Sequence, residues 1–246
     1  MQQRVAPPAA VQGAMQSLAT RLNRAARPAA TRQNRGLLAW GAVVLIAFAL
    51  GLGVQWGLAQ AGDRWLVLAG DVVLLAAGIG YQAARSAARR AVDGVAGLAP
   101  ARAGRVGAIA NGRLAARFAE GAVALSLVFL LFGLPGVFAV KAGQWLAHAV
   151  EDDREGAFGR AVRACQGLVL TPAALLAGVM IGLGHLPRLA VAPGPAVAAL
   201  EDSLDRAGLG HAAPAQRLQA ARIVTDRAHA LWLVILVAAS LVASLL

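Results

Sequence analysis

The side chains best suited to chemistry are acidic groups at the edges of apolar stretches. Residues 151–155 read Glu-Asp-Asp-Arg-Glu, and carboxylates this dense can bind Mg²⁺ through oxygen atoms. A solvated loop is the favoured alternative for this cluster. Glu120 stands immediately before a long apolar run. It is either a site residue or an anchor at the membrane interface. Asp71 lies inside another such run, where burying a charge in the bilayer costs free energy unless the charge is paired or hydrated. Asp71 is therefore either a functional residue or a residue close to the interface near Arg64.

Several kinds of site are excluded by residue type and spacing. The only lysine, Lys141, is followed by alanine, so the chain has no G-x-x-x-x-G-K-[ST] phosphate-binding loop. The four histidines are widely separated and form no i, i+4 pair, so we expect no metal site built from them. Cys165 is the only cysteine, which excludes a disulfide within the chain and a multi-cysteine zinc site.

Composition indicates that these groups belong to a membrane protein. Hydrophobic residues make up 59 % of the 246 residues, charged residues only 14 %, and the mean hydropathy is +0.63. A soluble domain carries about 25 % charged and about 45–50 % apolar residues. We therefore predict an all-α, multi-pass membrane protein of a bacterial-type inner (plasma) membrane, in contact with membrane lipid.

Five apolar runs are candidate membrane helices, since about 20 residues cross a bilayer. The third is broken by Gly133-Leu134-Pro135-Gly136, which predicts a kinked or re-entrant segment. Gly53-x-x-x-Gly57 in the first run favours close helix packing over a ligand role. Shorter helices are predicted over 85–98 and 195–209. The apolar runs are 37–59, 65–84, 122–140, 167–186 and 228–246.

The basic residues give the orientation of the first two runs. Residues 1–36 hold six arginines and no acid, and residues 85–120 hold seven arginines against two acids. Both segments lie on one side if the first two runs form a hairpin, and the positive-inside rule places that side in the cytoplasm. We therefore predict a basic cytoplasmic N-terminal segment over 1–36. A single helical membrane domain over 37–246 follows, with a cytoplasmic basic loop at 85–120. Topology explains the basic charge. The sequence has no basic stretch interleaved with aromatic residues, so we expect no nucleic-acid partner.

A series of short motifs runs along nearly the whole chain. They are Arg21-Leu22-Asn23-Arg24, Arg85-Ser86, Ala119-Glu120, Leu134-Pro135-Gly136 with Lys141-Ala142, Arg154-Glu155, and Phe158-Gly159-Arg160-Ala161. In type and order they resemble motifs of the CobD/CbiB family, the adenosylcobinamide-phosphate synthases of cobalamin biosynthesis. The resemblance implies ATP-dependent amide bond formation between a corrinoid carboxylate and aminopropanol phosphate, with ATP and Mg²⁺ as the implied cofactors.

Four polar side chains fall on family-like positions: Glu120, Lys141, Glu155 and Arg160. On the resemblance, Glu120 and Glu155 could hold Mg²⁺, while Lys141 and Arg160 could neutralise phosphate oxygens. Alternatively, Glu120 and Lys141 anchor the two ends of one helix at the membrane interface, and this simpler interpretation is favoured.

The chain departs from the family pattern at three polar elements. Gly121-Ala122-Val123-Ala124 replaces Asn-Thr-x-Asp, residues 144–148 replace an Asn-Thr-x-Asp-Ser element, and Ala164-Cys165-Gln166-Gly167 replaces Arg-Leu-Asp-Asp. Apolar side chains cannot stabilise a developing phosphoryl or tetrahedral charge, so we expect weak synthase turnover from the isolated protein. The alternative function is a non-catalytic membrane scaffold, a partner subunit of cobalamin-pathway proteins or an AmpE-like sensor. A third hypothesis, a small transporter, is supported only by Asp71 and the broken third run.

The topology is testable by cysteine labelling from outside the cell. In a Cys165→Ser background, single cysteines replace Arg27, Asp63 and Arg102, and an impermeant thiol reagent is added to intact cells. We expect labelling of the Asp63 position alone, because only the 60–64 turn is predicted to face outward. Labelling at Arg102 without labelling at Asp63 would invert the topology.

Overall fold

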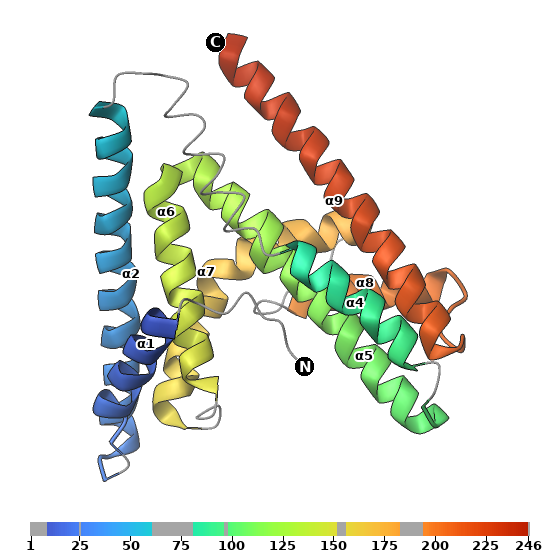
Figure 1. Ribbon diagram of the computed structural model, residues 1–246, viewed down its shortest axis with the longest axis horizontal. Helices are drawn as coiled ribbons and strands as arrows, with labels where there is room; N and C mark the ends of the chain where they lie inside the picture. Colours follow the sequence, from blue (N-terminus) through green and yellow to red (C-terminus); the bar gives the residue numbers. More distant parts are fainter. Residues whose placement is uncertain are drawn as a thin grey trace. The chain divides into compact units, whose positions relative to one another are not determined.

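The computed structural model describes residues 9–24, 26–60, 81–95, 98–151, 156–182 and 194–245. Every element of regular structure within these ranges is helical, as predicted (Figure 1). In chain order the elements are α1 (Ala9–Leu22), α2 (Ala29–Gln60), α4 (Tyr81–Val95), α5 (Pro100–Arg117), a π-helix η1 (Phe118–Val123), α6 (Ala124–Ala149), α7 (Ala157–Gly182), α8 (Gly194–Arg206) and α9 (Pro214–Leu245).

Three helical stretches of the described residues are long and apolar enough to cross a membrane: Ala29–Gln60, Ala101–Ala149 and Ala157–Gly182. They contain the first and third predicted runs and most of the fourth. The second run, 65–84, lies outside the described residues except for its last four positions, which begin α4. Residues 228–245 of the fifth run form the C-terminal part of α9. The described residues therefore support three candidate spans, where the sequence predicts five.

The two shorter helices predicted from sequence are both present. The run 85–98 falls largely within α4, and the run 195–209 largely within α8. The chain leaves α8 through Gly208, whose φ of 75° lies in the left-handed region that glycine adopts without a Cβ clash. The end of α8 therefore follows from a glycine C-cap.

The helices form two compact units, each built from segments that are distant in sequence. The first comprises residues 1–79 and 125–169, and so contains α1, α2, nearly all of α6 and the N-terminal half of α7. The second comprises residues 80–124 and 170–246, and contains α4, α5, η1, α8 and α9.

Small residues on α2 set the helix packing of the first unit. A Cβ added to Gly36 would lie 2.7 Å from the Phe158 carbonyl oxygen of α7, and one added to Gly51 would lie 2.6 Å from Cα of Pro135 in α6. Backbones can approach this closely only where a side chain is absent. No atom of the described residues lies within 4 Å of a Cβ added to Gly53 or Gly57, so close packing at these two glycines stays a prediction.

A kink interrupts α6 at Gly133, as the sequence predicts. Gly133 has φ 66° and ψ −154°, and Pro135 follows in the first turn of the next limb. A Cβ on Gly136 would lie 2.5 Å from Cγ1 of Val128, although eight residues of straight helix span about 12 Å. The chain thus turns back on itself at Gly133 (Figure 1). Its crossing or re-entering the bilayer stays a prediction.

The core of the second unit lies between α5 and α9, which pack on each other and on α4 and α8. Leu114 and Phe118 from the α5 side and Leu218 from α9 are fully buried. At the unit's edge, Arg217 of α9 forms ion pairs with Glu201 and with Asp205 of α8; its separation from Asp205 is 3.1 Å. These ion pairs therefore link α8 to the start of α9.

The kink is testable with glycine-to-alanine substitutions. Gly133→Ala forces a Cβ into a positive-φ conformation and against the Gln55 amide, 2.7 Å away. We expect the free energy of unfolding in detergent to fall by about 1–3 kcal/mol. The matched control is Gly41→Ala, where an added Cβ meets no atom within 4 Å; it should be neutral or slightly stabilising. Equal effects of the two substitutions would contradict the kink.

Candidate functional site

Glu120 lies in the π-helix η1 of the second unit, a feature that sequence analysis did not anticipate. Its neighbours Phe118, Ala119, Ala122 and Val123 are at most 1 % exposed, whereas Glu120 itself is partly exposed. A π-helix inserts one extra residue into a helical turn, and such bulges occur frequently at functional sites. The carboxylate therefore stands at an irregular point of an otherwise regular helix.

The surroundings of η1 include an imidazole from α9. The ring of His229 packs edge-to-face on Phe118, with centroids 6.1 Å apart and an interplanar angle of 85°. Thr225, one turn earlier on α9, is fully buried and donates to the Ala221 carbonyl oxygen at 2.7 Å. Polar groups thus line the buried stripe of α9 that faces the α5 side of this unit.

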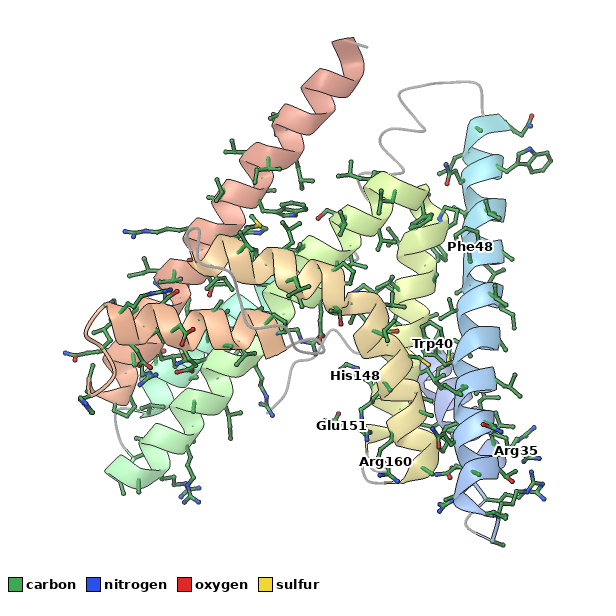
Figure 2. All side chains as sticks on the ribbon, turned by 180° about the vertical axis from the view of Figure 1, so that it is seen from behind. Arg35, Trp40, Phe48, His148, Glu151 and Arg160 are labelled. Carbon is green, nitrogen blue, oxygen red and sulfur yellow. The ribbon has the colours of Figure 1, made fainter. Side chains whose placement is uncertain are left out.

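Lys141 and Arg160 belong to the first unit. Lys141 is half-buried on α6, eight residues before its end, and Arg160 is exposed three residues after the start of α7. Arg160 lines a hollow of about 290 Å³ together with Gln33 of α2 and three alanines of α7. Figure 2 shows Arg160 and Arg35 at the same end of this unit. The structure therefore places one candidate phosphate-binding side chain in a hollow.

Of the other predicted site residues, Lys141 lies on α6 of the same unit. Glu120 belongs to the second unit, and Glu155 and Asp71 lie outside the described residues. Within the described ranges no group of three or more His, Cys, Asp or Glu side chains could hold a metal ion. The acidic cluster 151–155 lies outside the described residues except for Glu151, so Mg²⁺ binding there stays a prediction.

A hydrogen bond inside the first unit was also missed by sequence analysis. Trp40 Nε1 on α2 donates to Gln166 Oε1 on α7 at 3.1 Å, and Gln166 is only 4 % exposed. Gly143 on α6 makes room for this pair, because an added Cβ would lie 2.1 Å from the same Gln166 oxygen. The sequence does show a glutamine at the edge of an apolar run. Once buried, such a side chain needs a hydrogen-bond partner.

The three stretches that depart from the motif pattern, 121–124, 144–148 and 164–167, take different positions in the structure. Residues 121–124 are all buried in apolar packing. The other two stretches each contain a buried amide, Gln144 at 8 % and Gln166 at 4 % exposure. Both amides lie inside the first unit.

Comparisons of the chain with family models, with curated proteins and with solved structures found no match.

The Trp40–Gln166 hydrogen bond predicts a measurable loss of stability. Trp40→Phe keeps the ring packing but leaves the buried Gln166 oxygen without this donor, so the free energy of unfolding in detergent should fall by about 1–2 kcal/mol. Trp56→Phe is the control on the same helix, because Trp56 is 69 % exposed. If Trp40→Phe and Trp56→Phe unfold at the same denaturant concentration, the bond contributes nothing.

Proposed function

We propose that this protein is a divergent CobD/CbiB-type membrane protein acting on corrinoid intermediates of cobalamin biosynthesis. It lies in a bacterial inner membrane with its N-terminus in the cytoplasm. Its reaction joins a corrinoid carboxylate to aminopropanol phosphate with the hydrolysis of ATP.

One observation carries the proposal: the backbone irregularities of the described helices coincide with family-like motifs. Ala119-Glu120 falls in the π-helix, and Gly133, with its positive φ, directly precedes Leu134-Pro135-Gly136. Helices depart from regular geometry where a neighbouring group or a function requires it. Two of the six motifs noted on sequence grounds thus lie where the helices depart from regular geometry, which supports a shared architecture.

Basic side chains of this chain supply the charge that the reaction needs. Arg160, exposed in its hollow, can form paired hydrogen bonds to phosphate oxygens, and Lys141 adds a second positive charge in the same unit. The Glu120 carboxylate is the candidate acidic group of the second unit. ATP would supply the phosphoryl group that activates the corrinoid carboxylate for attack by the amine.

A non-catalytic role is the second candidate, and the packing of residues 121–124 favours it. These positions are buried and apolar, so they offer no hydrogen bond to a developing charge. A scaffold, a partner subunit or an AmpE-like sensor would keep the helical architecture without the chemistry. The two candidates differ in whether purified protein turns over a corrinoid acid and aminopropanol phosphate with ATP.

A deletion strain tests the proposal. Under conditions that require cobalamin, we expect growth to fail without supplement and to recover with cobinamide, which already carries the amide bond in question. Plasmid-borne Glu120→Ala and Arg160→Ala should fail to restore growth, whereas Arg113→Ala, exposed on α5, should restore it.

Protein levels are measured for each variant in the same cells. If Glu120→Ala and Arg160→Ala are expressed normally and complement fully, these two residues do not form the proposed site, and a scaffold role is then the better account. Growth of the deletion strain without any supplement would exclude the cobalamin pathway altogether.

A further inference from the structure

A polar hollow lies between α2 and α7, at the end of the first unit where both helices begin. It measures about 290 Å³ and is lined by Gln33 of α2 and by Ala157, Arg160, Ala161 and Ala164 of α7. The α7 residues follow the spacing i, i+3, i+4 and i+7, so they share one face of that helix. Because three of them are alanines, they leave open space, and the side-chain polar groups of the wall are the Gln33 amide and the Arg160 guanidinium.

A close contact of the two backbones holds these two polar groups near each other. A Cβ added to Gly36 of α2 would lie 2.7 Å from the Phe158 carbonyl oxygen and 3.0 Å from Cβ of Ala161. Gln33 stands about one helical turn before Gly36, and Arg160 stands two residues after Phe158. The amide and the guanidinium therefore come from different helices on either side of a tight contact, and one small molecule in the hollow can bind both.

The charge at this end of the unit favours an anion. Residues 21–36 and 151–163 hold eight arginines against four acids, so positive charge remains even if every acid is paired. Figure 2 shows Arg35 and Arg160 at this end. Arg160 is exposed in the first turn of α7, where the helix dipole also favours a negative group. A phosphate group suits this position, because it pairs with a guanidinium through two parallel hydrogen bonds.

The volume of the hollow limits the size of that anion. Pockets for drug-sized ligands measure about 300–1,000 Å³, and this hollow of about 290 Å³ lies just below that range. A corrinoid or a nucleoside triphosphate needs more room, whereas the phosphate monoester of a short amino alcohol fits. The Gln33 amide adds selectivity, because its oxygen accepts hydrogen bonds and its nitrogen donates them.

We infer that this hollow binds aminopropanol phosphate, the smaller of the two phosphate-bearing reactants, and that Gln33 distinguishes it from other phosphate monoesters. Arg160 pairs with the phosphate oxygens, and Gln33 Oε1 accepts a hydrogen bond from the amino group. ATP is then bound elsewhere and does not compete for Arg160. The identity of the ester rests on the proposed function, whereas the charge and the size of the hollow do not.

Isothermal titration calorimetry of the full-length protein in detergent tests the inference without corrinoid or turnover. The probes are aminopropanol phosphate, propyl phosphate, which lacks the amine, and ATP. We expect one aminopropanol phosphate per protein, bound about tenfold more tightly than propyl phosphate, because propyl phosphate cannot make the hydrogen bond to Gln33. Saturating ATP should leave the affinity for aminopropanol phosphate unchanged, because ATP does not fit the hollow.

Matched variants test the two polar groups separately. Gln33→Ala should remove the tenfold preference and leave the affinity for propyl phosphate unchanged. Asn34→Ala, which removes the neighbouring exposed amide of α2, should keep the preference. Arg160→Gln should weaken the binding of both esters by about tenfold or more, since it removes the charge-assisted hydrogen bonds.

A second pair of variants tests the size of the hollow. Ala164→Trp places a large ring in the hollow at an exposed position of α7 and should abolish the binding of both esters. Leu168→Trp, one turn further along α7 where the side chain is 72 % exposed, should not. Circular dichroism checks the folding of each variant. If Ala164→Trp does not fold, the Gln33→Ala and Asn34→Ala pair decides.

Four results would overturn the inference. They are absence of binding, displacement of aminopropanol phosphate by ATP, equal effects of Gln33→Ala and Asn34→Ala on the preference, and equal binding by the Ala164→Trp and Leu168→Trp proteins. The deletion strain separates these failures from failure of the proposed function. If the protein binds the ester as expected but the strain grows without supplement, the pathway alone is rejected. If the strain requires the protein but Gln33→Ala changes no affinity, the hollow alone is rejected.

Discussion

The first unit depends on the backbone conformation at Gly133, which a residue with a Cβ adopts only under strain. With φ at 66° and ψ at −154°, the helical hydrogen-bond ladder is interrupted in a segment apolar enough to lie in a membrane. A break at that depth is tolerated only where other protein covers it. Helix α2 supplies the cover: Gly51 lies against Pro135, and the Gln55 amide lies against Gly133.

An apolar hollow of about 180 Å³ lined by α2, α6 and α7 is a consequence of this turn. Because the chain turns back, Val128 before the break and Val140 after it line the same hollow, and α2 closes it with Trp40, Val44 and Phe48. A straight helix would separate these two α6 residues by about 18 Å. The Trp40–Gln166 hydrogen bond then ties α2 to α7. One glycine thus determines both how α6 packs and where the unit leaves an apolar hollow.

Sequence analysis could predict what depends on composition and local spacing. The helical character of α2, α4, α7 and α8 follows from apolar runs and helix-forming residues, and the kink in α6 follows from its Gly-Leu-Pro-Gly sequence. Local chemistry is enough for these features because each is decided within a few residues. The site residues Glu120 and Arg160 were identified from short motifs, but their surroundings were not.

The remaining features depend on contacts that spacing does not encode. Trp40 and Gln166 are 126 positions apart in the sequence, so their pairing requires the packed unit. The π-helix at Phe118–Val123 shifts the helical register by one residue, which leaves the apolar pattern almost unchanged. Gly53 and Gly57 have the spacing of a helix-packing motif. Among the glycines of α2, however, Gly36 and Gly51 make the close contacts with other described residues, because the approach of a neighbouring helix decides which glycine is used.

The turn at Gly133 is the central claim, and a distance across it tests the claim most directly. Spin labels on cysteines replacing Leu127 and Trp145, in a Cys165→Ser background, report the separation by double electron–electron resonance in detergent or lipid. A straight helix would separate these positions by about 27 Å. The account predicts a distribution centred well below that distance, since the two limbs fold together beside Val128 and Gly136. A distribution centred at about 27 Å or beyond would contradict the turn and the hollow that it creates.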